Sequence, residues 1–303
     1  MEGPLFTVVV PATTANLGPG YDSVGMALSL YMTVSVAPAD KWSVQYEGDE
    51  YAKLTTGSNN LIVRTVLNVA ERFGKEVAPH SLHVVSDIPL GKGLGSSATA
   101  IAAGIVIADG LLGLDLQPVE KARIGSELEG HSDNVTAALL GGITITYFTR
   151  EELEIIQLPP PAIGAVILVP PKALRTEESR GLLPKQLPHS EAASGGAASS
   201  MMTTAMAIGD WELAGRMMEK DVFHESYRKK LLPEFDEIRA YCHEIGAYGM
   251  TISGAGPSLF VAVEEGTEEE VAEKLKRKFP YYEGFALQTA ASGANIQTKN
   301  AQP

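Results

Sequence analysis

Residues 89–110 read PLGKGLGSSATAIAAGIVIADG, so a cluster of glycines stands directly before a run of small apolar residues. Ordering a cluster of glycines is entropically unfavourable, so the three glycines within residues 91–95 indicate a structural or functional requirement at this place. A β-branched segment at 82–85 predicts a strand before the glycines, and residues 96–112 predict a helix after them. The first N–H groups of a helix lack partners and lie at the positive end of its dipole. The order strand, glycine turn, helix thus predicts a site for an anion such as phosphate.

The glycine turn does not match three better-known loops. A P-loop needs Gly-x4-Gly-Lys-Ser/Thr, but here Lys92 precedes Gly93. A Rossmann fingerprint needs a third glycine at the correct spacing, and Gly95 is followed by Ser96 instead. The Gly-x-Ser-x-Gly nucleophile elbow is also missing. A plain turn that only connects the strand to the helix stays an alternative.

The composition and net charge of the chain exclude several classes of protein. The chain has 303 residues, of which 45% are hydrophobic and 20% charged, so a sizeable core is expected and a disordered protein is not. The formal charge of −13 argues against a general nucleic-acid binder, although a local pocket can still attract an anionic small molecule. A single cysteine, Cys242, allows no internal disulfide and no cysteine-rich metal site. Without a leader pattern or a membrane-spanning run, the expected location is the cytoplasm.

Strands and helices mix along the whole chain, which predicts an α+β fold without internal repeats. Strands are expected at 5–10, 26–36, 42–46, 81–85, 143–147, 165–169, 250–253, 259–263 and 285–289. Helices are expected at 60–73, 96–112, 119–128, 134–140, 191–208, 211–218, 233–245 and 268–279. The segment 191–208 has a linker-like composition, but its methionines at helical spacing favour a helix. The triple proline 159–161 predicts a boundary between a first lobe at 1–158, which contains the predicted phosphate site, and a second lobe at 159–303.

Two further turns follow strands. Residues 11–22, PATTANLGPGYD, are compatible with a plain turn, and residues 251–263, TISGAGPSLFVAV, with a hairpin loop. Together with the central loop, and in this order, they resemble the three motifs of the GHMP kinases, a superfamily that includes galactokinases, homoserine kinases and mevalonate kinases. The resemblance extends from about residue 5 to about residue 290.

Within that superfamily, three segments are similar to the homoserine kinase family. They are EGHSDNVTAALLGG at 129–142, TEESRGLLP at 176–184 and ESYRKKLLP at 225–233. The resemblance implies phosphorylation of the side-chain hydroxyl of L-homoserine by MgATP, on the route to threonine. It also implies a ribosomal-protein-S5-like N-terminal lobe and a ferredoxin-like C-terminal lobe with a cleft between them. The alternatives are a GHMP kinase for another small alcohol, such as mevalonate or a sugar, and a non-catalytic nucleotide-binding relative.

The resemblance also assigns roles to residues. The ATP-binding set is Asn60 at the adenine and Pro89, Leu90, Gly91, Lys92, Gly93, Leu94, Gly95, Ser96, Ser97, Ala98 and Thr99 around the phosphates. The substrate-binding set is Asn16, Asp22, His131, Asp133, Asn134, Thr176, Arg180, Arg228 and Gly254. Ser97 and Glu127 are the expected Mg²⁺ ligands, with Glu129 as a rival to Glu127. Whether the chain forms a homodimer stays open.

The chemistry of a zwitterionic amino alcohol suits these residue types. Its ammonium needs a carboxylate, which Asp22 or Asp133 supplies, and its carboxylate needs a guanidinium, which Arg180 and Arg228 supply. Taken singly, each arginine is more often a surface ion pair, and only the flanking motifs favour the binding role.

The expected catalytic residues are Asn134, Lys92 and Ser97. An amide cannot accept a proton at neutral pH, so the resemblance implies catalysis by alignment and charge neutralisation. Lys92 stands where arginine is commoner and is given a helpful rather than an essential role, and Ser200 stands where relatives often carry asparagine. A hydrolase triad of Ser97, His131 and Asp133 is disfavoured, because no oxyanion motif accompanies it.

Overall fold

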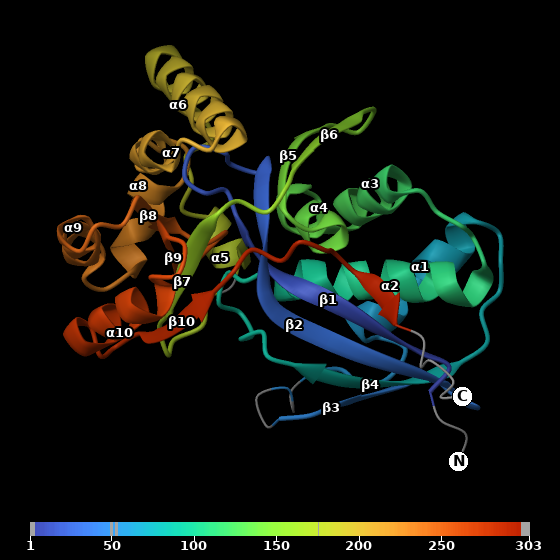
Figure 1. Ribbon diagram of the computed structural model, residues 1–303. Helices are drawn as coiled ribbons and strands as arrows, with labels where there is room; N and C mark the ends of the chain where they lie inside the picture. Colours follow the sequence, from blue (N-terminus) through green and yellow to red (C-terminus); the bar gives the residue numbers. More distant parts are fainter. Residues whose placement is uncertain (1–3, 49–50, 52–53, 175, 298–303) are drawn as a thin grey trace.

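The computed structural model describes residues 4–48, 51, 54–174 and 176–297, and it contains two lobes that are each built on one sheet (Figure 1). Of Thr176 only the backbone is described. Within these residues, none of the helices combines the length and the apolar composition that crossing a membrane requires. The two-lobed α+β architecture agrees with the expectation from the sequence.

The first lobe contains a seven-stranded sheet. Its strands follow the order β11-β1-β2-β4-β3, with β5 paired to β2 and β6 paired to β5. Among the described strands of this sheet, β3 and β4 form the one parallel pair, and the other pairs are antiparallel. The strands are β1 (Phe6–Ala15), β2 (Val24–Pro38), β3 (Ser43–Tyr46), β4 (His80–Ser86), β5 (Ile143–Phe148), β6 (Leu153–Leu158) and β11 (Asn295–Gln297).

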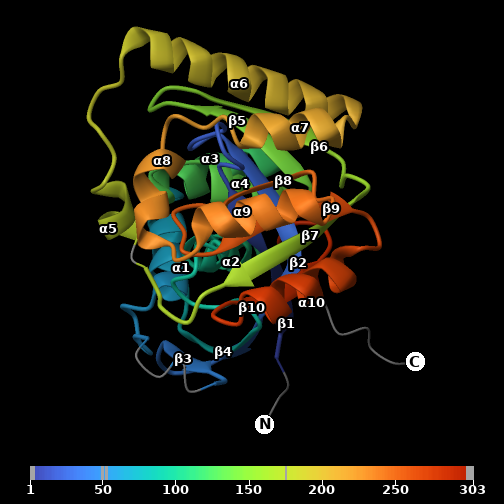
Figure 2. The same cartoon turned by 90° about the vertical axis from the view of Figure 1, so that its left-hand side faces the viewer.

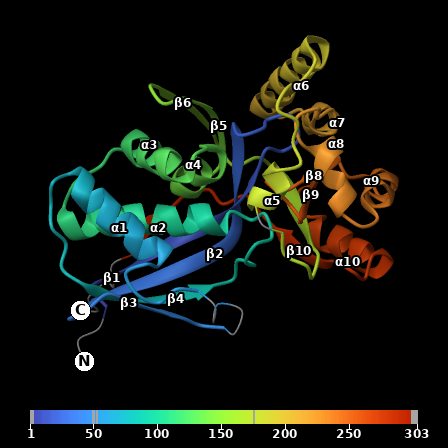
Figure 3. The same cartoon turned by 180° about the vertical axis from the view of Figure 1, so that it is seen from behind.

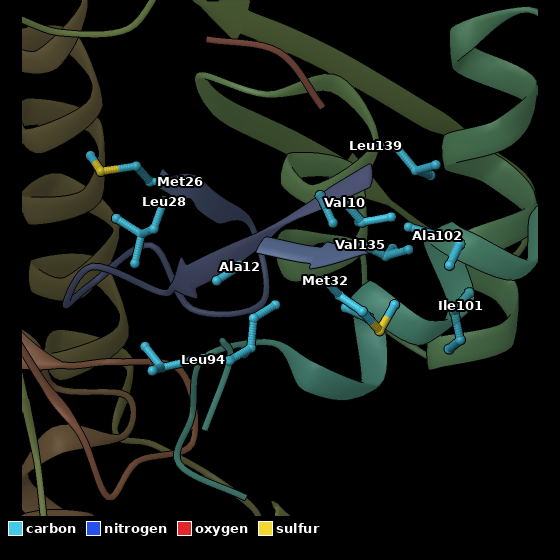
Figure 4. Close-up of a cluster of buried hydrophobic side chains, with 14 of the residues drawn as sticks. Val10, Ala12, Met26, Leu28, Met32, Leu94, Ile101, Ala102, Val135 and Leu139 are labelled. Carbon is cyan, nitrogen blue, oxygen red and sulfur yellow. The ribbon is translucent and has the colours of Figure 1, made fainter. Parts of the chain in front are cut away.

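Four helices cover one face of this sheet (Figure 3). They are α1 (Leu61–Arg72), α2 (Ser96–Leu112), α3 (Pro118–Glu129) and α4 (Asp133–Leu140). The central helix is α2, whose residues from 101 to 108 are all buried. Figure 4 shows side chains of α2 and α4 meeting those of β1 and β2, and Leu94, which precedes α2, is fully buried in the same core. The apolar composition of α2 therefore fixes it in the middle of the lobe, with its N-terminus at the glycine turn.

The second lobe contains a four-stranded antiparallel sheet of order β10-β7-β9-β8. Its strands are β7 (Ile163–Val169), β8 (Gly249–Ile252), β9 (Leu259–Glu264) and β10 (Glu283–Leu287). Its helices are α5 (Thr176–Arg180), α6 (His189–Ile208), α7 (Trp211–Met218), α8 (Glu225–Arg228), the 3-10 helix η2 (Lys229–Leu231), α9 (Phe235–Glu244) and α10 (Glu268–Lys278). Figure 2 shows α6 lying along one end of the molecule beside α7, so the segment 191–208 is a helix and not a linker.

The structure differs from the sequence-based expectation in two respects that matter for the site. The first strand is expected to end at residue 10, before Pro11, but β1 continues to Ala15, with a shift of register between Pro11 and Ala12. A proline without an N–H is tolerated at such an irregularity. The extra length carries the following turn into the space between the lobes.

The second difference concerns the division of the chain. The expected boundary after residue 158 falls between β6 and β7, which belong to different sheets. The strand β11 pairs with β1, so residues 295–297 lie in the sheet of the first lobe. Both β6 and β11 are short strands with exposed positions, and their sequences contain no long β-branched run that would have predicted them.

Close packing of α1 against α2 depends on Gly104, and this can be tested. A Cβ there would lie 2.5 Å from Thr65 Cβ, so we expect Gly104→Ala to destabilise the fold by about 1–3 kcal/mol. The matched control is Gly196→Ala on α6, where a Cβ meets nothing within 4 Å and the better helix former should add about 0.5–1 kcal/mol. Urea unfolding of both variants measures this, and an equal effect of the two substitutions would contradict the packing role of Gly104.

Candidate active site

A cavity of about 190 Å³ lies where the two lobes meet. The first lobe contributes the turn after β1, the glycine loop before α2 and the junction between α3 and α4. The second lobe contributes Leu174, Arg180 at the end of α5, Arg228 at the end of α8, and the turn Gly254–Ala255 after β8. The three sequence motifs, far apart along the chain, therefore line one space.

The glycine loop is held between β1 and the turn that follows β8. Gly91, Gly93 and Gly95 all have positive φ, at +66°, +77° and +72°. A Cβ on Gly95 would lie 2.0 Å from Thr13 Oγ1, and one on Gly93 would lie 2.3 Å from the Ser253 carbonyl oxygen. Only glycine fits this close approach with this backbone. The loop ends at the N-cap of α2, so the helix N-terminus faces the cavity and can bind an anion.

Several side chains of the expected phosphate loop have other partners. Leu94, Ala98 and Thr99 are fully buried. The Lys92 ammonium donates to the carbonyls of Pro170 (2.6 Å) and Pro171 (2.7 Å), so it ties the loop to the end of β7 rather than pointing freely into the cavity. Pro89 and Leu90 lie outside the main cavity, in neighbouring pockets. Much of this segment can therefore contact a phosphate only through its backbone.

The acidic partner of Ser97 is Glu129 and not Glu127. Ser97 Oγ donates to Glu129 Oε2 at 3.2 Å, and both residues line the cavity. Glu127 instead forms ion pairs with Arg72 (2.5 Å) and Arg123 (2.6 Å). In this structure the expected Mg²⁺ ligand Glu127 therefore faces away from Ser97, because residues two apart on a helix point to different faces. Burial raises the pKa of Glu129 above its ordinary value.

Asn60, which the family resemblance places at the adenine, has a capping role in this structure. Asn60 is the N-cap of α1, and its Oδ1 accepts from the Ile62 N–H at 2.9 Å. Its Nδ2 donates to the Tyr46 hydroxyl (2.8 Å) and to the Thr55 carbonyl (2.7 Å). The side chain is buried and both N–H groups have partners, so it holds the start of α1.

A second, smaller cavity of about 50 Å³ lies beside this cap, next to the first turn of α2. Its walls include the stacked rings of Tyr46 and Tyr51, whose centroids are 5.5 Å apart, together with Ile88 and Leu90. A flat aromatic group suits walls of this kind. The sequence analysis did not single out the two tyrosines, since they stand in a segment without a motif.

The turn after β1 connects the two lobes through Asn16. Its backbone has φ +68°, its Nδ2 donates to the Gly254 carbonyl at 2.9 Å, and its Oδ1 accepts from the Asp22 N–H at 3.0 Å. The Gly254 N–H in turn donates to the Ala15 carbonyl at 3.0 Å. The first and third motifs therefore fold onto each other and form one wall of the cavity.

Two arginines of the second lobe lie at this wall, and they have different hydrogen-bond partners. Arg180 forms a two-point ion pair with Asp22, with distances of 2.6 and 3.1 Å. Arg228 is only 2% exposed, donates to the Gly254 carbonyl at 3.1 Å, and has no acidic partner at ion-pair distance among the described residues. Its Nε has no hydrogen-bond partner there either, and burial lowers its pKa. A buried cation without a counter-ion is unfavourable, so this position favours an anionic ligand.

On the opposite side, His131, Asp133 and Asn134 form a connected group. His131 Nδ1 donates to Asp133 Oδ1 at 2.6 Å, and the Asn134 N–H donates to the same oxygen at 2.7 Å. Burial lowers the pKa of His131, but the hydrogen bond and charge of Asp133 outweigh this and raise the pKa above its ordinary value. Ligand atoms of Asp22, His131 and Asp133 lie within 4.8 Å of one another, which is a suitable spacing for a cation.

Two further residues contact the expected site residues, and the sequence did not point to either of them individually. Thr13 donates its hydroxyl to Asn134 Oδ1 at 2.8 Å, and Tyr21 contacts Arg180. Both stand in the first motif, which was the available signal, but the motif alone did not show what they contact. Thr176, an expected substrate ligand, is the first residue of α5, and its side chain lies outside the described residues.

Comparison with known proteins identifies the family. The model of the GHMP kinases N terminal domain matches residues 60–142, and that of the GHMP kinases C terminal domain matches residues 202–280. A homoserine kinase of Bacillus velezensis is 42% identical over 293 residues, which cover 97% of this chain and 95% of that protein. The chain belongs to the homoserine kinase family.

Other homoserine kinases give the same result. One from Bacillus cereus is 44% identical over 274 residues, or 90% of each chain. The crystal structure of homoserine kinase from Cytophaga hutchinsonii superposes with a TM-score of 0.85 at 26% identity, over 96% of this chain and 97% of that one. The similarity thus covers both lobes of the homoserine kinase fold.

The His131–Asp133 pair predicts a measurable titration. We expect the His131 ring to titrate above 6.5 in NMR spectra of the folded protein, and Asp133→Asn to move that titration to lower pH. A raised folded-state pKa stabilises the fold below pH 6.5, and this contribution is lost as the pH rises through the folded pKa. Asp236→Asn, which removes an exposed partner of Lys229, is the control and should leave His131 unchanged. An unchanged His131 titration in Asp133→Asn would refute the pairing.

Proposed function

We propose that this protein transfers the γ-phosphoryl group of ATP to the side-chain hydroxyl of L-homoserine, and that it does so in the cytoplasm as a step towards threonine. The observation that carries the choice of substrate is Arg228, a buried cation with no acidic partner at ion-pair distance in the described part of the chain. The family membership gives the reaction class, this charge gives the reason for an acceptor with a carboxylate, and the acidic cluster of Asp22, His131 and Asp133 gives the reason for an ammonium beside it.

The zwitterion fits the charges of the cavity. Its carboxylate would pair with Arg228 and Arg180, whose guanidinium groups match a carboxylate at two points. Its ammonium would lie in the cluster of Asp22, His131 and Asp133, where carboxylate oxygens are close together. A metal ion would suit the same spacing. An ammonium group is favoured because the two neighbouring arginines would bind the carboxylate of the same molecule.

The nucleotide would lie along the start of α2. Its phosphates would contact the N–H groups of the glycine loop and the helix N-terminus, and its adenine would enter the cavity beside Tyr46 and Tyr51. Asn60 would support this cavity indirectly, since it donates to the Tyr46 hydroxyl. Lys92 would hold the loop in place through the carbonyls of Pro170 and Pro171.

The donor set of Ser97 and Glu129 fits Mg²⁺. The ion prefers oxygen ligands, and these two residues present a hydroxyl and a carboxylate to the same side of the cavity. The buried Glu129 carboxylate has a raised pKa, so a cation beside it would offset its charge. When bound, Mg²⁺ neutralises charge on the phosphate oxygens.

Catalysis would depend on positioning, because none of Asn134, Lys92 and Ser97 is an evident base. Asn134 is fixed by Thr13 and by Asp133, so its side chain can orient the substrate hydroxyl but cannot accept its proton. The substrate hydroxyl would attack the γ-phosphorus in line with the bond to the β–γ bridging oxygen, this bond would break and release ADP, and the hydroxyl proton would leave late, to a phosphate oxygen. Alignment and charge neutralisation supply most of the rate enhancement in reactions of this class.

The substrate test compares four acceptors. With ATP and Mg²⁺, we expect ADP release with L-homoserine to exceed that with mevalonate, galactose or L-serine by at least about 100-fold in kcat/KM. Mevalonate lacks the ammonium, galactose lacks both charges, and serine is one methylene shorter. Higher turnover of mevalonate or galactose would establish a different GHMP kinase, and no turnover of any acceptor would favour a non-catalytic relative.

The metal assignment predicts different effects at two neighbouring glutamates. Glu129→Gln should lower kcat by about 10- to 100-fold and raise the Mg²⁺ concentration needed for half-maximal rate. Glu127→Gln is the matched control: it loses the exposed pairs with Arg72 and Arg123, which should change stability by less than about 1 kcal/mol and leave the Mg²⁺ dependence unaltered. A Mg²⁺ titration of both variants measures these effects. A larger effect of Glu127→Gln than of Glu129→Gln would instead favour Glu127 as the Mg²⁺ ligand.

A further inference from the structure

Tyr21 stands between the two arginines of the cavity. Its ring centroid is 5.7 Å from the guanidinium carbon of Arg180 and 5.7 Å from that of Arg228. Its hydroxyl accepts a hydrogen bond from Arg180 Nη1 at 3.0 Å. One aromatic side chain therefore contacts both cations that would bind the substrate carboxylate.

This contact offsets an unfavourable charge arrangement. Arg228 is buried, has no carboxylate at ion-pair distance within the described ranges and lies in the positive field of Arg180. Asp22 neutralises Arg180 directly but reaches Arg228 only over a longer distance. The negative face of an aromatic ring attracts a guanidinium, and more strongly where water is excluded. Tyr21 thus supplies the nearest favourable interaction that both guanidinium groups share.

The ring is itself held in place from the second lobe. The His224 ring lies 5.6 Å from it, and His224 is fully buried with its Nε2 bonded to the Gly18 carbonyl at 3.0 Å. His224 is the N-cap of α8, the short helix that ends at Arg228. Tyr21 therefore packs against both ends of the segment that carries Arg228.

We propose that Tyr21 is a positioning residue that sets the two guanidinium groups for the substrate carboxylate and so makes the carboxylate a condition for efficient binding. This inference rests on the proposed function. Tyr21 acts through Arg180 and Arg228 and does not touch the reacting atoms. Its removal should therefore impair substrates that bear the carboxylate and spare those that lack it.

The test compares two variants on two substrates. Tyr21→Leu removes ring and hydroxyl and should lower kcat/KM for L-homoserine by about 10- to 100-fold, mainly through KM. Tyr21→Phe keeps the ring and should lose about 3- to 10-fold. For 3-aminopropan-1-ol, which is homoserine without its carboxylate, both variants should match the wild type within twofold. Where its turnover is too slow to follow, inhibition of homoserine phosphorylation by this compound gives the same comparison.

Controls separate positioning from folding. The KM for ATP should stay within twofold, and Tyr147→Leu, at an exposed tyrosine on β5, should change neither substrate. Equal losses for both substrates, or no loss in Tyr21→Phe and Tyr21→Leu, would overturn the role of Tyr21. If Tyr21→Leu does not fold, Tyr21→Phe decides. A wild-type protein that does not phosphorylate homoserine would instead refute the proposed function.

Discussion

The site depends on one steric constraint, namely that the backbone before α2 is enclosed on two sides with no room for a side chain. On one side lies Thr13 of β1, and on the other the turn after β8 of the second lobe. The apolar, fully buried body of α2 fixes the position of the helix, and the glycines let its polar end reach the space between the lobes. The same helix thus packs into the core through its apolar side chains (Figure 4) and presents its N-terminus to the cavity.

The other half of the cavity is organised by charge. Acidic groups come from the first lobe, at Asp22, Glu129 and Asp133, and the two arginines come from the second lobe. Asp22 and Arg180 satisfy each other across the boundary, whereas Arg228 has no such partner among the described residues. A small molecule with one charge of each sign can complete this balance, while a neutral sugar cannot.

The sequence predicted what local patterns encode. Helical spacing and β-branched runs identified most elements, and three glycine-containing motifs identified the family. The sequence did not predict which way each side chain of a helix faces. Glu127 and Glu129 are two positions apart, and only the packing of α3 near α1 shows that Glu127 pairs with Arg72. The role of Asn60 as the N-cap of α1 was also not foreseen, and no motif marks the pairing of β11 with β1.

That terminal pairing makes the second lobe an insertion into the first. The chain leaves the seven-stranded sheet after β6 and re-enters it at β11, so the second lobe is attached by two covalent connections. Two tethers oppose twisting of one lobe against the other and leave bending about the line between them as the easier motion. A fragment that stopped at the triple proline would lack β11 and would leave the edge of β1 open to other strands.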